Sequence, residues 1–251
     1  MNQRNKTVLI TGATAGIGEA CARVFARENF NLILTGRRKE RLEKLQKELI
    51  KTYPVNIQIL CFDVQCKGEV EESLSSLPED LQDIDVLINN AGLSQGLEPI
   101  NEGSLCDWET MIDTNIKGLL YVTKIVSNWM VQRKSGHIIN LGSIAGKEVY
   151  SNGNVYCATK HAVDALNKAM RIDLLPYGIR VTGIHPGAVE TEFSEIRFHG
   201  DKERAAQVYA GYQPLKAEDI AETIWFAVSR PAHVTINDLV IMPTAQASTS
   251  H

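Results

Sequence analysis

The stretch KTVLITGATAGIGEACARVFAR, residues 6–27, decides the fold of this chain. It opens with a short apolar run typical of a buried strand, and an amphipathic helical pattern closes it. Between them lie Gly12, Gly16 and Gly18, whose missing β-carbons let backbone amides approach an anion at the helix N-terminus. A glycine cluster alone indicates only a tight turn, but the order strand, turn, helix predicts a site for a dinucleotide pyrophosphate.

Short apolar runs and longer helical patterns alternate along the rest of the chain. Strand patterns occur at NLILT, NIQILCF, DVLINN, HIINLGS, IRVTGIHP and VTINDLVIM, and helical patterns at 16–29, 39–51, 67–76, 107–133, 155–176 and 217–230. Continuous apolar strands joined by right-handed crossovers predict a Rossmann-type α/β fold, a doubly wound parallel sheet of about seven strands with helices on both faces. We expect a single catalytic domain over residues 1–251, with a substrate lid at 190–212.

The composition excludes several classes of protein. A net charge of -4 over 251 residues gives no basic field, which argues against a nucleic-acid partner. The N-terminus lacks the apolar core of a signal peptide, and charges or glycines interrupt every hydrophobic run, so neither secretion nor a membrane span is expected. The five cysteines show no spacing typical of disulfides or zinc. We therefore expect a cytoplasmic protein without a metal.

The residues after the second strand pattern select the cofactor. NAD-binding folds place an acidic residue there for the adenosine ribose, whereas this chain has Gly36, Arg37 and Arg38. Guanidinium groups bind a 2′-phosphate through charge-assisted hydrogen bonds. An ordinary cationic helix start is the alternative, but cations at a helix N-terminus oppose the macrodipole unless an anion is bound. The sequence therefore predicts NADP (NADPH).

Tyr156 and Lys160 lie four residues apart in a helical pattern, so both side chains project from one face and can share a site. A nearby ammonium and an oxidised nicotinamide would lower the pKa of a phenol from its usual value of about 10. Tyr156 is thus the candidate acid/base, and Lys160 a ligand of the nicotinamide ribose. A tyrosine and a lysine at this spacing also occur by chance on solvated helices.

Ser143 ends the strand pattern HIINLGS, at the sheet edge where ligands collect. Its hydroxyl can orient and polarise a substrate oxygen, although a structural turn at the strand end is the alternative. LGSIAG lacks the GxSxG elbow of a nucleophilic serine. Cys157 is equally unconvincing as a nucleophile, because no histidine pairs with it in the local sequence and buried cysteines are common.

TGATAGIG, NNAG at 89–92, Asn115, Ser143, Tyr156 with Lys160, and the HPG turn at 185–187 together resemble the short-chain dehydrogenases/reductases, over nearly the whole chain. The resemblance implies that Asn115 holds a water in a proton relay from Lys160, although polarity on a helix surface is the local alternative. It also implies that Asn89 stabilises the central strand. The predicted cofactor site comprises Gly12, Thr14, Gly16, Ile17, Gly18, Arg37, Arg38, Asp63, Val64, Asn90, Ala91, Gly92, Tyr156, Lys160, Pro186, Gly187, Val189 and Thr191.

LILTGRRKERL, GNVYCATK and INDLVIMP are similar to bacterial NADP-dependent 3-hydroxy acid dehydrogenases, which act on serine or allo-threonine, and to sulfoacetaldehyde reductases. Such substrates are small anions, so a cation is expected near the chemistry. Arg197 is the first candidate and Lys147 the second. Tyr150 either lines the substrate pocket or merely packs. His185 is either a pocket residue or, as we favour, a satisfied core histidine.

Two other functions compete with a dehydrogenase of small hydroxy acids. The chain would be a carbonyl or 3-oxoacyl reductase if its substrate were neutral, because catalytic residues do not choose a substrate. It would be an NADP sensor if it had lost turnover. The long amphipathic helical patterns at 107–133 and 155–176 have more apolar surface than one sheet face can cover. In similar proteins these helices pair between subunits. We expect a homo-oligomer, a tetramer.

Overall fold

A computed structural model describes residues 5–209 and 211–249. Residue 210, within the predicted lid, and the two ends of the predicted 1–251 domain lie outside the described residues. Among the described residues, no helix is long and apolar enough to cross a membrane.

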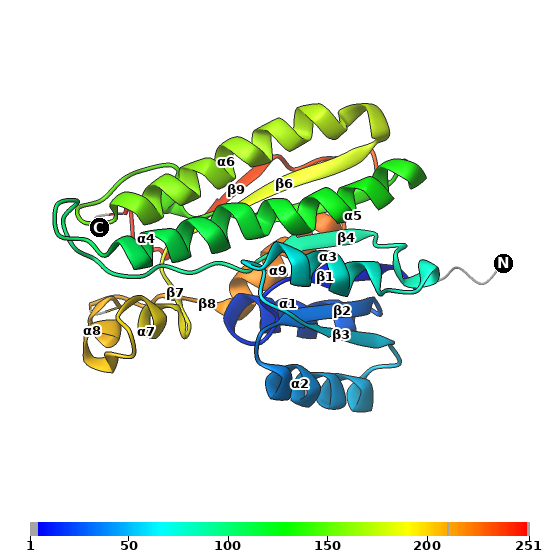
Figure 1. Cartoon of the computed structure of the whole chain (residues 1–251), viewed down its shortest axis with the longest axis horizontal. Coiled ribbons are helices and arrows are strands. Elements are labelled where there is room, and N and C mark those ends of the chain that lie inside the picture. The colour runs from blue at the N-terminus through cyan, green and yellow to red at the C-terminus, as the bar shows by residue number, and fades with distance from the viewer. Residues whose placement is uncertain (1–4, 210, 250–251) are drawn as a thin grey trace.

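Seven parallel strands form the central sheet, in the order β3-β2-β1-β4-β5-β6-β9 (Figure 1). They are β1 (Thr7–Ile10), β2 (Asn31–Gly36), β3 (Ile57–Cys61), β4 (Val86–Asn89), β5 (Gly136–Leu141), β6 (Ile179–Pro186) and β9 (Asp238–Ile241). Leu9 of β1 pairs with Ile33 of β2 on one side and with Leu87 of β4 on the other, and all three are fully buried. The strand order reverses between β1 and β4, which is where such sheets bind ligands. The predicted doubly wound sheet is confirmed.

Helices cover both faces of the sheet because successive strand side chains point to opposite faces. Val8 and Ile10 of β1 pack in a core cluster with α1 (Gly16–Arg27), α2 (Lys39–Thr52) and α9 (Ala217–Val228). Leu9, between them, belongs to a second cluster with α3 (Lys67–Ser75), α5 (Leu119–Arg133) and α6 (Asn154–Leu174). This alternation explains why the strands read as continuous apolar runs.

Several sequence predictions differ from the structure in their bounds or in their internal structure. The helix expected at 107–133 is divided into α4 (Leu105–Ile112), a π-helical turn (Asp113–Gly118) and α5. The helix expected at 155–176 ends at Leu174, and a 3-10 turn containing Pro176 follows. The segment 190–212 carries two short helices, α7 (Phe193–Arg197) and α8 (Lys202–Gln207), beside a small sheet of β7 (Val189–Glu190) and β8 (Leu215–Lys216).

Candidate active site

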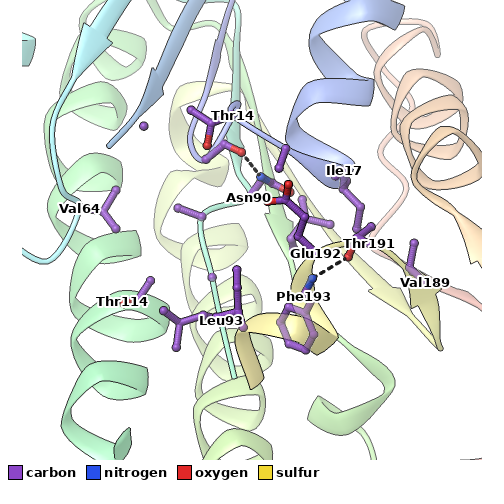
Figure 2. Close-up of a pocket in the computed structure, with 18 of the residues that line it drawn as sticks. Thr14, Ile17, Val64, Asn90, Leu93, Thr114, Val189, Thr191, Glu192 and Phe193 are labelled. Atoms are coloured by element: carbon purple, nitrogen blue, oxygen red, sulfur yellow. Dashed lines mark hydrogen bonds between the residues drawn. The ribbon is translucent and has the colours of Figure 1, made fainter. Parts of the chain in front are cut away.

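A cavity of about 470 Å³ lies at the carboxyl edge of the sheet. The loops that follow β1 to β6 form its wall, and Figure 2 shows Val64 and Thr114 on one side with Thr191 and Phe193 on the other. Ser143 and the residues predicted to bind a cofactor line the cavity, except Gly18. The structure thus gathers side chains from across the sequence into one site.

The glycine turn leaves room for a pyrophosphate. Gly12 and Gly16 have φ values of 67° and 54°, which favour glycine. Gly18 lies behind the cavity, where a β-carbon would come 2.3 Å from the Gly12 carbonyl oxygen. No side chain caps the first amides of α1, because the N-cap residue is Ala15. These amides and the helix dipole suit an anion, so the turn fits a dinucleotide.

The three arginines beside the turn lie in different surroundings. Arg37 is mostly exposed and pairs with Asp63 at 3.2 Å. Arg38 donates to the Thr14 hydroxyl at 3.1 and 2.8 Å and to Glu192 at 2.8 Å, and Arg41 donates to Glu192 at 2.7 Å. The sequence prediction missed Arg41 and Glu192. GRRKERL places Arg41 in the first turn of α2, three residues after Arg38, the N-cap residue, but no local pattern connects Glu192 to this site.

Tyr156 and Lys160 both project from α6 into the cavity wall and are nearly buried. The Lys160 ammonium donates to the Leu141 carbonyl at 2.8 Å and lies 6.0 Å from the centroid of the Tyr156 ring. Burial lowers the pKa of Lys160 to about 8. The fold therefore holds a cation near the phenol, and no carboxylate of the described residues forms an ion pair with it.

Burial is also the largest influence on Tyr156. It raises the pKa of the phenol well above the usual value, assisted by Tyr150 and opposed by Arg197 and by a hydrogen bond with Ser143. At neutral pH the phenol is therefore protonated and able to donate. The Ser143 oxygen also accepts from the Ala145 amide at 3.1 Å. Ser143 therefore forms the structural turn at the strand end and also lies beside the phenol, so the two interpretations are compatible.

Asn115 lies in the π-helical turn and is almost fully buried, so the interpretation as surface polarity is wrong. Its side-chain oxygen accepts from the Leu93 amide at 2.9 Å. Its nitrogen donates to the Leu93 carbonyl at 2.8 Å and to the Thr159 hydroxyl at 3.0 Å. Because both side-chain donors are used, Asn115 fixes the loop after β4 against α6, beneath the cavity.

Asn89 acts within the sheet. It donates to Thr123 at 2.8 Å and to Asn140 at 2.9 Å, which links β4 to α5 and β5. Asn90 donates to the carbonyls of Thr11 and Gly12, which ties the loop after β4 to the glycine turn. These amides explain why the NNAG segment is needed at this edge.

Arg197 lies beside the cavity rather than in its wall. Its guanidinium donates to the Ser94 hydroxyl at 3.0 Å and to the Tyr150 hydroxyl at 2.5 Å. The guanidinium carbon is 5.2 Å from the Tyr156 ring centroid and 5.7 Å from that of Phe193. Tyr150 therefore does more than pack. Ser94 was missed, because nothing in its local sequence connects it to residue 197.

Lys147 and His185 belong to a partly buried charge cluster apart from the cavity. The Lys147 ammonium pairs with Asp164 at 2.6 Å and lies 3.6 Å from Asp238. His185 is fully buried and bonds Asp238 through Nε2 at 3.0 Å. The structure thus engages Lys147 elsewhere. His185 is a core histidine, as expected, but only its Nε2 is satisfied, because its buried Nδ1 has no hydrogen-bond partner among the described residues.

Comparison with known proteins fits this geometry. The short chain dehydrogenase family matches residues 6–201. The NADP-dependent 3-hydroxy acid dehydrogenase YdfG of Salmonella typhi is 49% identical over 241 residues, 96% of either chain. The serine 3-dehydrogenase of Agrobacterium fabrum is 43% identical over 96% of this chain and 95% of its own.

Solved structures agree. The closed form of a serine dehydrogenase complexed with NADP+ superposes with a TM-score of 0.92 at 48% identity, over 96% of both chains. Serine dehydrogenase from Escherichia coli superposes with a TM-score of 0.83 at 44% identity, over 96% of this chain and 99% of that one. With the family match covering most of its length, this chain belongs to the short chain dehydrogenase family.

Proposed function

We propose that this chain is an NADP(H)-dependent oxidoreductase that interconverts a small hydroxy acid and its oxo form, with a 3-hydroxy acid as substrate. The observation that carries the proposal is the position of Tyr156. Its ring lies where the dinucleotide-type cavity meets the Arg197 guanidinium, 5.2 Å away. A proton donor, a cofactor cradle and a cation for a substrate anion are then adjacent.

The residues divide the chemistry as follows. When bound, nicotinamide supplies or accepts the hydride at the substrate carbon. Tyr156 gives its phenolic proton to the carbonyl oxygen in reduction and takes the alcohol proton in oxidation. Ser143 donates to the same oxygen and orients it. Lys160 holds the nicotinamide ribose and returns the phenol to its working protonation state. Asn115 fastens the loop after β4 to α6 and, as the family resemblance implies, would hold a relay water.

The rest of the cavity is assigned to the cofactor. Arg37 and Arg38 would hold the adenosine 2′-phosphate, Asp63 and Val64 the adenine, and Thr191 the carboxamide of nicotinamide. This is supported by the continuous wall that these residues share. Segment 190–212 is proposed as the substrate lid, since it contributes Arg197.

The test is turnover with NADPH or NADP+ against three sets of compounds: 3-hydroxy acids with their oxo forms, sulfoacetaldehyde, and neutral ketones of similar size. We expect activity on the anions, lost in Tyr156→Phe while NADPH still binds. Higher kcat/KM on neutral carbonyls would replace this proposal with a carbonyl or 3-oxoacyl reductase. NADPH binding without turnover of any compound would indicate a sensor.

We also propose a cytoplasmic homotetramer. Apolar side chains remain exposed on and near the long helices, notably Leu120, Ile172 and Leu175, the last two at 73%. Such a surface favours association with a second copy. All five cysteines are free, as a reducing compartment favours. Light scattering that gives a monomer mass at micromolar concentration would contradict the assembly.

A further inference from the structure

Glu192 joins the two ends of the site. It is the N-cap residue of α7, next to Thr191. One oxygen of its carboxylate accepts from Arg38 at 2.8 Å, and the other accepts from Arg41 at 2.7 Å. The two arginines lie 154 and 151 residues earlier in the chain. The start of the proposed lid is thus fastened to the arginines beside the glycine turn.

The carboxylate is ionised in this position. The hydrogen bond from Arg38 is the largest influence and lowers the pKa of Glu192 below its usual value; burial opposes it, and the hydrogen bond from Arg41 adds to the lowering. The remaining donors of Arg38, Nε and Nη2, point to the Thr14 hydroxyl. Arg38 therefore has its fork engaged on Thr14 and Glu192, whereas Arg37 pairs only loosely with Asp63 at the surface.

A carboxylate and a phosphate are alternative ligands of a guanidinium, and two anions at one guanidinium pair repel each other. We propose that Glu192 is a specificity residue that competes with the adenosine 2′-phosphate for Arg38 and Arg41. The inference rests on the proposed function for its ligand, NADP(H). A cofactor with the 2′-phosphate must displace Glu192, which releases the first residues of the lid. A cofactor with a 2′-hydroxyl leaves the contact in place.

Glu192→Gln tests the competition in the full-length chain by calorimetric titration with NADPH, NADH and 2′,5′-ADP. Because the ion pairs are partly exposed, each contributes modestly. NADPH and 2′,5′-ADP should bind about 3- to 10-fold more tightly to the variant, and NADH within twofold of wild type. Glu195→Gln is the matched control, because it removes the same charge from an exposed residue of α7. It should leave all three affinities unchanged.

Weaker NADPH binding by Glu192→Gln would overturn the inference, since Glu192 would then position the arginines for the phosphate. An equal gain in affinity for NADH, or the same gain in affinity in Glu195→Gln, would show that only the net charge matters. Either result would also overturn the inference. So would unchanged affinities in both Glu192→Gln and Glu192→Ala. These outcomes leave the proposed function intact, whereas wild-type protein that binds neither NADPH nor 2′,5′-ADP would overturn both.

Hydrogen exchange supplies a second readout that does not depend on affinity. In wild type, NADPH should speed exchange at 192–197 relative to NADH, because only NADPH breaks the ion pairs. In Glu192→Gln the two cofactors should give the same exchange there. A wild-type segment that NADPH and NADH protect equally would contradict release of the lid.

Discussion

Replacement of Arg197 by Gln should separate charged from neutral substrates. The change removes the cation but keeps a side chain able to bond Ser94 and Tyr150, the two groups that hold it. A hydrogen bond to an ionised group contributes about 1.5 to 3 kcal/mol. At about 1.4 kcal/mol per factor of ten, KM for a hydroxy acid should rise roughly 10- to 150-fold. KM for a neutral alcohol of the same size should stay within about twofold.

Steady-state kinetics at saturating NADP+ measure both substrates in one preparation. Arg197→Lys, which keeps the charge but not the planar fork, should fall between wild type and Arg197→Gln. Tyr150→Phe is the matched control, because it removes one partner of the guanidinium and leaves its charge. An unchanged KM for the acid in Arg197→Gln, or an equal rise for the neutral alcohol, would refute the assignment of Arg197 to the substrate anion.

Three further predictions concern other parts of the chain. Arg37→Asp should weaken NADPH binding at least tenfold and NADH binding far less, by fluorescence titration; equal losses would remove the arginine from cofactor selection. Gly18→Ala should impair folding or cofactor binding, because its β-carbon would lie 2.3 Å from the Gly12 carbonyl oxygen; a wild-type Tm together with a wild-type NADPH Kd would contradict this. Burial lowers the pKa of His137 to about 3. Since the unfolded chain binds this proton near pH 6.5 and the folded chain does not, the free energy of unfolding should fall by up to about 1.4 kcal/mol per unit as pH drops below 6.5. Urea denaturation of His137→Gln should show a shallower decline, and an identical slope would speak against the assignment.

The fold was predictable because its signals are local and repeated. Each buried strand is an apolar run in the sequence. The glycine turn identifies the strand before it as β1, next to the point where the strand order reverses. The bounds of helices were less predictable where tertiary contacts intervene. Around Asn115, buried hydrogen bonds of its side chain with Leu93 and Thr159 stabilise a wider, π-helical turn. The periodicity of the sequence does not predict this turn.

The candidate site was predictable where a motif places two groups on one element, as for Tyr156 and Lys160. It was not predictable where the partners come from distant loops. Glu192 meets Arg38 across 154 residues, and Arg197 meets Ser94 across 103. Neither pair leaves a local trace, since a charged or polar side chain taken alone is interpreted as an ordinary surface residue. The protonated state of Tyr156 likewise follows from burial, which spacing does not reveal.

The π-helical turn of 113–118 decides which side chains of the continuous helical segment from α4 to α5 face the site and which face the sheet. One extra residue rotates everything after it by about 100° relative to an uninterrupted helix. Met111, before the turn, packs with Tyr156, whereas Val122 and Val126, after it, pack against the sheet. Deleting one residue from the turn would restore regular winding and bring the wrong side of α5 to the sheet. The continuous helical segment from α4 to α5 can therefore contact both Tyr156 and the sheet only because the π-helical turn rotates one part relative to the other.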